Sequence, residues 1–187
     1  MEKKVKTCVF ISGKGTNLDH IIKNSRSYNF PIKVDLIISN NSKAEGLNIA
    51  KKHNIPFICV SYKDQSFFER ICLFELRKKN IKFLCLAGFM KVLSSKFIRS
   101  FNGKIINIHP SLLPKYKGLN TYKRVLKNNE LYSGCSVHYV SNKLDGGKII
   151  LQKKFMLDKN ETEKTLKLKT LKKEHLLYSQ SIISLFK

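Results

Sequence analysis

The chain has 187 residues, of which 42% are hydrophobic and 10% aromatic, a balance that excludes an intrinsically disordered chain and suits one folded domain. Its five cysteines are an odd number without a C-x-x-C pair, which argues against a disulfide framework or a zinc site and is typical of a reducing compartment. Met1–Lys4 lacks a signal-peptide pattern, and the longest apolar run, Phe83–Met90, is far shorter than the roughly 20 residues of a membrane span. We therefore expect a cytoplasmic protein.

The net charge of +23 comes from 36 Lys and Arg residues against 13 Asp and Glu. A basic surface attracts polyanions, so a nucleic-acid face must be considered. The lysines are scattered along the chain without an arginine-rich block, and Lys, Asn and Ile are abundant together, as an AT-rich genome would produce. We favour a solvated surface shaped by composition, followed by general attraction of small anionic substrates. A nucleic-acid partner is not expected.

Apolar, β-rich runs alternate with amphipathic stretches in the first hundred residues. The expected strands are Val5–Ser12, Lys33–Ser39, Phe57–Val60 and Lys82–Ala87, and the expected helices are Thr16–Ser27, Ala44–His53 and Ser66–Lys79. Such alternation with nearly continuous apolar strands is the signature of a parallel sheet covered on both faces. We predict an α/β fold, a single Rossmann-like domain with a mostly parallel sheet and helices on both faces.

After residue 100 the pattern changes. Ile105–Ile108 predicts a strand and Thr121–Lys127 a helix, while Ser136–Val140 and Lys148–Phe155 predict strands that could pair as a hairpin or sit as successive strands. A long C-terminal helix is expected over residues 161–186, with Glu174 beside its apolar face. That face is predicted from steps of three and four: Leu168, Leu171, His175, Tyr178, Ile182 and Leu185.

Four polar or glycine-rich segments follow predicted strands. They are Ser12–Asn17, Gly88–Leu93, Asn107–Pro114 and Ser141–Gly147. Ligands of open α/β sheets bind outside the carboxyl ends of the strands. The convergence of these segments therefore predicts a functional site at this edge.

The segment Ser12–Asn17 is a glycine turn that opens a helix. Such a turn presents free backbone N–H groups and the positive end of the helix dipole, which suits phosphate. It is not a Walker A loop, because Cys8 occupies the place of the first glycine, and Leu18 stands where a dinucleotide fingerprint needs its third glycine. A small phosphate monoester is therefore favoured over NAD. The structural alternative is a helix N-cap by Thr16 or Asn17.

Asn107 and His109 lie two residues apart on a predicted strand, so their side chains share one face. An amide donor and an imidazole side by side at a strand end can flank a carbonyl and donate to an oxyanion. A buried structural histidine is the alternative. Pro110 and Pro114 stiffen the loop that follows.

Asp145 lies in Leu144–Gly147, where the glycines allow a sharp turn toward another loop. A carboxylate facing His109 would orient that imidazole and favour its cationic form. On its own, however, the Asp-Gly pair reads as an ordinary turn. His138 could compete for the catalytic role, but its mid-strand position favours a half-buried structural role.

Four collinear segments carry a close resemblance to a known family: VFISGKGTNL (9–18), LAGFMKVLS (86–94), INIHPSLLPKYKGLNTYKRVL (106–126) and GCSVHYVSNKLDGGKIILQ (134–152). With them the chain resembles the 10-formyltetrahydrofolate-dependent formyltransferases. The S-G-x-G-T-N and G-L-N-T-Y-K stretches are similar to the branch that acts on glycinamide ribonucleotide.

The resemblance implies formyl transfer from 10-formyltetrahydrofolate, as cosubstrate, to the amine of glycinamide ribonucleotide in purine biosynthesis, without a metal. It implies a catalytic trio of Asn107, His109 and Asp145. It also implies ribonucleotide binding by Gly15, Thr16, Asn17 and Glu174. The residues implied to bind the folate are Gln65, Met90, Lys91, Val92, Leu93, Asn107, Ser141, Asn142, Lys143, Leu144 and Asp145.

The implied mechanism is direct attack of the amine on the formyl carbon, with His109 and Asn107 stabilising the tetrahedral oxyanion. We expect residues 1–187 to form one formyltransferase domain. Residues 1–100 would supply the phosphate- and ribonucleotide-binding half, and residues 101–187 the catalytic and folate-binding half.

Several departures and alternatives stay open. Gln65 and Lys91 stand where relatives often carry arginine, which puts folate affinity in question. The enzyme alternatives are a formyltetrahydrofolate hydrolase and a methionyl-tRNA formyltransferase, although 187 residues leave no room for the extra domain that each usually carries. From another class, the chain could be a non-catalytic nucleic-acid-binding module with a steep salt dependence. We expect small-molecule substrates, no membrane partner, and a monomer or homodimer.

Overall fold

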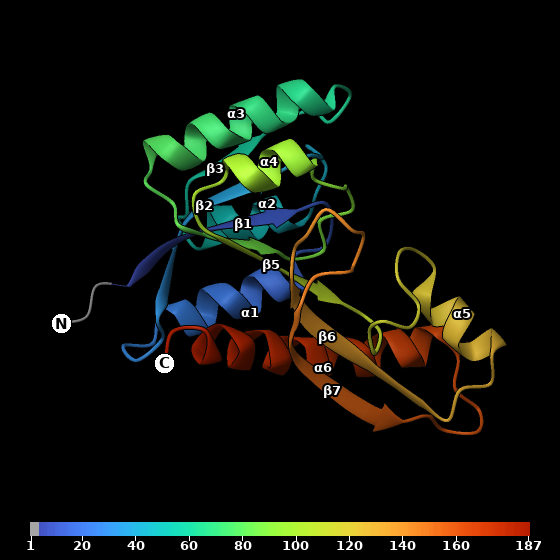
Figure 1. Ribbon diagram of the computed structural model, residues 1–187. Coiled ribbons are helices and arrows are strands. Elements are labelled where there is room, and N and C mark those ends of the chain that lie inside the picture. The colour runs from blue at the N-terminus through green and yellow to red at the C-terminus, as the bar shows by residue number, and fades with distance from the viewer. Residues whose placement is uncertain (1–3) are drawn as a thin grey trace.

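The computed structural model describes residues 4–187 as a central sheet with helices on both faces (Figure 1). Residues 1–3 lie outside the described residues. They are part of the expected domain and of the segment in which the sequence showed no signal-peptide pattern. The elements in chain order are β1 (Val5–Ile11), α1 (Thr16–Ser25), β2 (Ile32–Ser39), α2 (Gly46–Lys52), β3 (Phe57–Cys59), α3 (Gln65–Lys78), β4 (Phe83–Leu86), α4 (Ser95–Ser100), β5 (Lys104–His109), α5 (Thr121–Lys127), β6 (Tyr132–Tyr139), β7 (Ile149–Met156) and α6 (Glu163–Ser184).

The sheet has seven strands in the order β3-β2-β1-β4-β5-β6-β7. The pairs among β1 to β5 are parallel, whereas β6 runs antiparallel to both β5 and β7. The predicted α/β class with a mostly parallel sheet and a long C-terminal helix is confirmed. Of the two arrangements left open for the last two strands, the structure shows the hairpin.

Two hydrophobic cores lie on opposite faces of the sheet. Val9 and Ile11 of β1 point into one core with residues of α1, α2 and α6, while Cys8 and Phe10 point into the other with residues of α3 and α4. This alternation explains why the parallel strands read as continuous apolar runs, since both of their faces are buried. Figure 1 shows α1 and α6 side by side beneath the sheet, and the two helices are in contact.

The predicted apolar face of the C-terminal helix was only partly right. Tyr178 and Ile182 are buried, but Leu168 is 54% exposed. The packed face instead includes Leu166, and Glu174 lies on that face rather than beside it. The buried face of α6 also carries the polar residues Thr170 and Ser181. The predicted face differs from it because apolar spacing alone does not identify buried polar positions.

Helix α4 was not predicted from the sequence. It has only six residues, too few for a periodic apolar pattern to emerge. Its start is fixed by Ser94, whose Oγ accepts a hydrogen bond from the Phe97 amide at 3.0 Å. Phe97 itself is fully buried against the core on that face.

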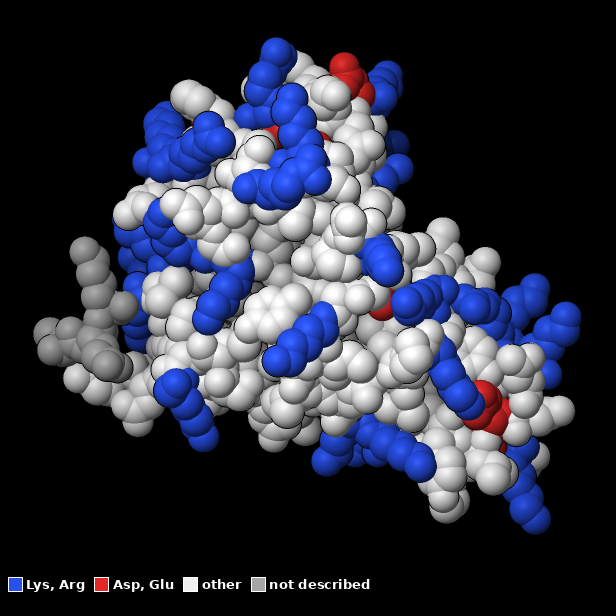
Figure 2. Space-filling model, in the orientation of Figure 1, with Lys and Arg blue, Asp and Glu red and all other residues white. Residues whose placement is uncertain are grey.

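Lysine and arginine side chains are spread over the whole face shown in Figure 2, with few acidic side chains among them. This matches the scattered distribution in the sequence. All five cysteines are free, and four of them are buried. Among residues 4–187, no helix combines the length and apolarity that crossing a membrane requires.

Candidate active site

The carboxyl ends of β1 and β4 mark the point where the strand order reverses, because β2 and β3 lie on one side of β1 and β4 and β5 on the other. Two hydrogen bonds join the loops that leave these strands. The Ser12 amide donates to the Gly88 carbonyl at 3.1 Å, and the Met90 amide donates to Ser12 Oγ at 2.8 Å. The predicted convergence of polar segments at this edge is therefore present.

A cavity of about 650 Å³ opens beside this edge. That volume lies within the range of pockets that enclose small-molecule ligands. Its lining comes from the loop after β4, the end of β5, the loop before and the start of α5, and the β6–β7 connection: Leu86, Gly88, Phe89, Met90, Lys91, Val92, Leu93, Asn107, Ile108, His109, Pro110, Gly118, Leu119, Asn120, Thr121, Tyr122, Lys123, His138, Val140, Ser141, Lys143, Leu144 and Asp145, with Glu163 and Lys167 of α6.

His109 and Asp145 meet in this cavity. His109 Nδ1 lies 3.3 Å from Asp145 Oδ2, and both side chains are less than a tenth exposed. The Gly118 amide donates to the same carboxylate oxygen at 2.8 Å. Asp145 adopts a left-handed backbone with φ of 44°, which a turn between loops requires and which aspartate tolerates better than most residues. Asp145 thus forms a turn and also contacts the histidine.

The other nitrogen of His109 faces the Tyr116 carbonyl at 2.8 Å. A carbonyl can only accept, so Nε2 is the donor of this bond. With a carboxylate at Nδ1 and a carbonyl at Nε2, the doubly protonated ring can donate at both positions. An acceptor group therefore lies at each of the two ring nitrogens of His109.

Tyr116 is itself held by a network on the far side of the loop. Its backbone has φ of 57°, its hydroxyl donates to Glu130 Oε1 at 2.7 Å, and Lys115 Nζ lies 2.8 Å from the same oxygen. The guanidinium of Arg124 lies over its ring, 5.4 Å from the centroid. These contacts fix the carbonyl that orients His109.

His138, for which a half-buried structural role was expected, is buried and also lines the cavity. It pairs with Asn107 across the β5–β6 ladder, and the Asn107 amide nitrogen lies 3.2 Å from His138 Nε2. His138 Nδ1 lies 2.9 Å from the Tyr139 carbonyl, so Nδ1 carries the proton and Nε2 accepts from Asn107. Burial lowers the pKa of His138, which keeps the ring neutral near pH 7.

Ser136 positions the loop that follows His109. Its Oγ donates to the Ser111 carbonyl at 2.6 Å and accepts from the Leu113 amide at 3.0 Å. Gln152 of β7 donates to the same Oγ at 2.7 Å and to the Leu113 carbonyl at 2.9 Å. The hairpin β6–β7 therefore supports the loop as well as supplying His138.

The glycine turn before α1 is not capped by a side chain, so the structural alternative, an N-cap by Thr16 or Asn17, does not hold. Gly15 occupies the N-cap position with φ of 74°. A Cβ on Gly15 would lie 2.6 Å from the Cα of Gly46, so the close approach of α2 excludes any side chain here. The first turn of α1 is thereby left without a side-chain acceptor, and its N–H groups suit an anion.

Asn17 instead turns toward the C-terminal helix. Its Nδ2 donates to Glu174 Oε2 at 2.8 Å, and its Oδ1 is buried without a hydrogen-bond partner among the described residues. Burial raises the pKa of Glu174 to about 7, against smaller opposing effects of Asn17 and Lys167. Two residues 157 positions apart thus form one buried polar pair next to the glycine turn.

Most of the predicted folate-binding residues line the cavity. Gln65 and Asn142 do not. Gln65 donates to Glu69 Oε1 at 3.0 Å and to the Val92 carbonyl at 3.1 Å, so it lies behind the loop that borders the cavity. Within the described part of the chain, no cluster of three or more His, Cys, Asp and Glu side chains is placed to hold a metal ion.

Sequence reasoning considered His138 only as a rival for the catalytic role, and it missed Tyr116, Gly118 and the residues of α5 that line the cavity. For His138 a signal existed, because alternation on a strand pairing antiparallel with Asn107–His109 would have aligned them. For Tyr116 and Gly118 the contributing groups are backbone atoms, which leave no mark in the side-chain pattern.

An α/β sheet with a cavity at its switch point, which holds a buried His–Asp pair and an adjacent amide, is the arrangement of an enzyme site. The comparisons with known proteins agree with this class. Residues 5–182 match the family model described as formyl transferase, and the chain belongs to that family.

Among curated relatives, phosphoribosylglycinamide formyltransferase of Haemophilus influenzae is 39% identical over 176 residues, which cover 92% of this chain and 83% of that protein. The trifunctional purine biosynthetic protein adenosine-3 of Homo sapiens is 36% identical over 97% of this chain, but the chain spans only 18% of its length. The crystal structure of phosphoribosylglycinamide formyltransferase from Campylobacter jejuni superimposes with a TM-score of 0.93 at 32% identity and covers 100% of both chains.

Proposed function

We propose that the chain transfers the formyl group of 10-formyltetrahydrofolate to the amine of glycinamide ribonucleotide in purine biosynthesis. The observation that carries the proposal is the His109–Asp145 contact of 3.3 Å in the same cavity as Asn107. The similar proteins of Haemophilus influenzae and Campylobacter jejuni bear the name of this activity.

The ribonucleotide would bind at the glycine turn. The uncapped first turn of α1, at Gly15, Thr16 and Asn17, offers N–H groups to its phosphate. The Glu174 carboxylate offers acceptors for ribose hydroxyls, as does Asn17 Oδ1, which has no hydrogen-bond partner among residues 4–187. The Ser12–Gly88 hydrogen bond holds this turn against the loop that borders the cavity.

The folate would occupy the cavity of about 650 Å³. Its pterin ring would lie between two loops, Met90, Lys91, Val92 and Leu93 on one side, and Ser141, Asn142, Lys143, Leu144 and Asp145 on the other. Exposed apolar side chains at the mouth, Met90 and Val92, are 66% and 60% exposed and offer surface to the remainder of the cosubstrate. Gln65 would act on this loop through the Val92 carbonyl.

The mechanism follows from the hydrogen-bonding groups. The amine nitrogen attacks the formyl carbon, the C–N bond forms, and the carbonyl oxygen becomes an oxyanion. The Asn107 amide donates to this oxyanion, and the oxyanion competes with the Tyr116 carbonyl for the Nε2 proton of His109. Collapse breaks the bond to the folate nitrogen, which receives the proton lost by the amine through His109 or a water molecule.

The test incubates the protein with 10-formyltetrahydrofolate, with and without glycinamide ribonucleotide. Formyl transfer that requires the ribonucleotide supports the proposal, and folate hydrolysis without it indicates a hydrolase. Absence of both reactions, with salt-dependent nucleic-acid binding, indicates a non-catalytic module.

Two variants test the trio. His109→Ala and Asp145→Asn should each lower kcat by about a hundredfold or more, because each removes or disorients an oxyanion donor. Asp19→Asn is a matched control, since Asp19 also contacts a histidine, His53 at 3.0 Å, but outside the cavity. Near-wild-type turnover in either trio variant would show that the trio is assigned wrongly.

The same proposal covers organisation and setting. Residues 1–100 would mainly supply the ribonucleotide site and residues 101–187 the catalytic groups, with Glu174 reaching back to the first half. We place the reaction in the cytoplasm, carried out on small molecules rather than nucleic acid by a monomer or homodimer. Sedimentation of the purified chain with and without both substrates tests the assembly state.

A further inference from the structure

The loop that follows β4, residues 88–94, is held from behind by helix α3. Its residues 90–93 line the cavity. Gln65 and Glu69 lie about one turn apart on α3, so they share one face of that helix, and both bond to the loop. Neither residue lines the cavity, and neither does Ser94, where the loop ends. Any effect of α3 on a ligand in the cavity must therefore pass through the loop.

Glu69 accepts three hydrogen bonds. The Ser94 amide donates to Oε1 at 2.6 Å, the Ser94 hydroxyl donates to Oε2 at 2.5 Å, and Gln65 Nε2 donates to Oε1 at 3.0 Å. The Ser94 hydroxyl also accepts from the Phe97 amide at 3.0 Å, so its own proton is available to Glu69. Glu69 thus fixes the point at which the loop passes into α4.

The Val92 carbonyl is a second anchor of the loop. The Tyr62 hydroxyl donates to it at 2.6 Å and Gln65 Nε2 at 3.1 Å. Burial raises the pKa of Tyr62, so the hydroxyl keeps its proton and acts as the donor. The anchors at Val92 and Ser94 flank Leu93, which is 5% exposed and lines the cavity. The backbone on both sides of Leu93 is thereby fixed.

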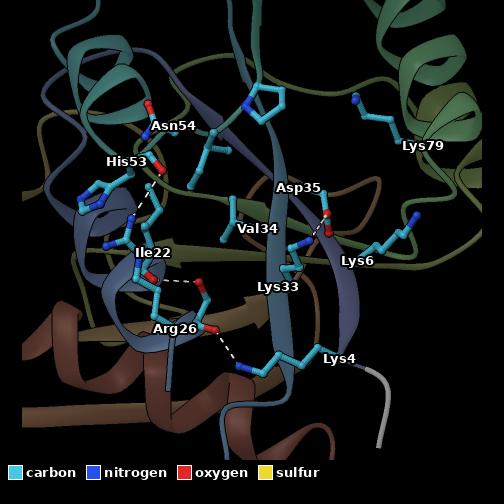
Figure 3. Close-up of a pocket in the computed structure, with 13 residues that line it drawn as sticks. Lys4, Lys6, Ile22, Arg26, Lys33, Val34, Asp35, His53, Asn54 and Lys79 are labelled. Carbon is cyan, nitrogen blue, oxygen red and sulfur yellow. Dashed lines mark hydrogen bonds and ion pairs between the residues drawn. The ribbon is translucent and has the colours of Figure 1, made fainter. Parts of the chain in front are cut away.

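Glu69 is buried without a counter-ion. It is 7% exposed and forms no ion pair within residues 4–187. Asp35 of β2, in contrast, lies 3.4 Å from Lys33, a pair that Figure 3 shows. Glu174, at the proposed ribonucleotide site, is 6% exposed and bonds to an amide rather than to a cation. The desolvation of such a carboxylate is not offset by an opposite charge, so it costs stability, as groups kept for function often do.

We propose that Glu69 is a positioning residue for the folate cosubstrate. Through Ser94 it holds the loop 88–94 in the course that places residues 90–93 against the folate, and Tyr62 and Gln65 hold the same loop at Val92. This inference rests on the proposed function, which assigns the loop to the folate. Because Glu69 lies behind the loop, its effect falls on folate affinity and not on the ribonucleotide or the reacting groups.

The first test measures the kinetics of Glu69→Gln against each substrate. The amide keeps the shape of the side chain but replaces one acceptor with a donor, which then faces the donors of Ser94. KM for 10-formyltetrahydrofolate should rise about tenfold, while kcat and KM for glycinamide ribonucleotide stay within about twofold. A general loss of folded protein would lower the apparent kcat instead and leave both KM values unchanged.

Glu75→Gln is the matched control, since it makes the same change on the same helix. Glu75 is half-buried, and its side chain forms no hydrogen bond or ion pair within residues 4–187. Both KM values of this variant should equal those of the wild type. Equal rises of the two KM values in Glu69→Gln, or a rise of the folate KM in Glu75→Gln as large as in Glu69→Gln, would overturn the proposal.

Two further variants test the anchors separately. Tyr62→Phe removes a bond to the Val92 carbonyl without a change of charge and should raise the folate KM about threefold. Ser94→Ala combined with Glu69→Gln should raise it by less than the product of the two single effects, because both changes break one contact. An unchanged folate KM in both Glu69→Gln and Tyr62→Phe overturns the proposal, and a full product overturns the role of the Ser94 contact.

Amide hydrogen exchange tests the hold on the loop without turnover. Glu69→Ala removes all three acceptor contacts, so the Ser94 amide should exchange about tenfold faster, while the amides of β4 keep their wild-type protection and show that the variant is folded. Unchanged exchange at Ser94 would show that Glu69 does not hold the loop. Faster exchange in a protein whose wild type neither binds nor uses the formyl folate would overturn the proposed function and the folate role, but not the hold on the loop.

Discussion

Replacing Glu174 with glutamine removes one buried ionisable group, and the effect on stability should depend on pH. Glu174 is only 6% exposed, and burial raises its pKa from the ordinary 4.5 to about 7. Asn17 and Lys167 oppose this shift, and the other groups that face it, Tyr122, Cys135 and Tyr178, are neutral near pH 7.

The sign follows from proton linkage. The folded state binds the Glu174 proton more tightly than the unfolded state, so the contribution of this group to stability is fully present below about pH 4.5 and is lost as the pH rises through 7. A shift from 4.5 to about 7 corresponds to roughly 3 kcal/mol. Glutamine stays neutral and can still accept from Asn17, so it avoids this loss.

The assay is urea unfolding of the wild type and Glu174→Gln at several pH values. The free energy of unfolding of the variant, relative to wild type, should rise by up to about 3 kcal/mol between pH 4.5 and pH 8.5. Glu45→Gln, a change at an exposed carboxylate, is the control and should show no comparable trend. A flat difference for Glu174→Gln, or one that grows as the pH falls, would refute the reasoning.

The same variant should bind the ribonucleotide less well. A carboxylate accepts hydrogen bonds from hydroxyl groups more strongly than an amide does, so KM for glycinamide ribonucleotide should rise about tenfold with little change in KM for the folate. A protein more stable at pH 8.5 but poorer in substrate affinity would indicate that Glu174 is kept for binding at a cost to the fold.

Three further outcomes are expected. Tyr116→Phe loses the hydrogen bond to Glu130 and should lower kcat about threefold to tenfold with unchanged KM. The variant should also move the pH–rate profile, because the Tyr116 carbonyl contacts His109. A purely structural role of Tyr116 would leave that profile unmoved. His138→Ala leaves the Asn107 amide unsupported and should lower kcat roughly tenfold to a hundredfold at unchanged folate affinity; an unaltered kcat would contradict its positioning role. Burial lowers the pKa of His175 from 6.5 to about 4. The contribution of His175 to stability is therefore present above pH 6.5 and lost as the pH falls through 4. His175→Asn should resist acid unfolding, followed by circular dichroism, better than wild type.

The sheet could be predicted because its parallel strands are buried on both faces. Five of the seven residues of Val5–Ile11 and all four of Phe83–Leu86 are apolar, and the helices between such strands are amphipathic. Short or polar elements have no comparable apolar pattern in the sequence. Helix α4 is fixed by one serine cap, and the packed face of α6 contains Glu174 because a polar partner, Asn17, lies opposite.

From the residue pattern alone, the candidate site could be predicted only where a single strand defines it, and Asp145 was added through the family resemblance. Asn107 and His109 share a face by alternation, and this needs no tertiary information. Asp145 reaches His109 through a left-handed turn, and His138 reaches Asn107 through the register between β5 and β6. Both contacts join segments about 30 residues apart or more, and no local pattern encodes them.

The two histidines beside Asp145 divide their tasks through hydrogen bonding. Asp145 Oδ2 lies 3.3 Å from His109 Nδ1, and Oδ1 lies 3.7 Å from His138 Nε2, so one carboxylate faces two imidazoles. Two imidazolium ions at this spacing would repel in a buried site. His138 stays neutral because burial lowers its pKa and because its Nε2 accepts from Asn107. Asp145 therefore faces one neutral imidazole, whose Nε2 accepts from the Asn107 amide, and a second imidazole, His109, whose Nε2 donates to the Tyr116 carbonyl.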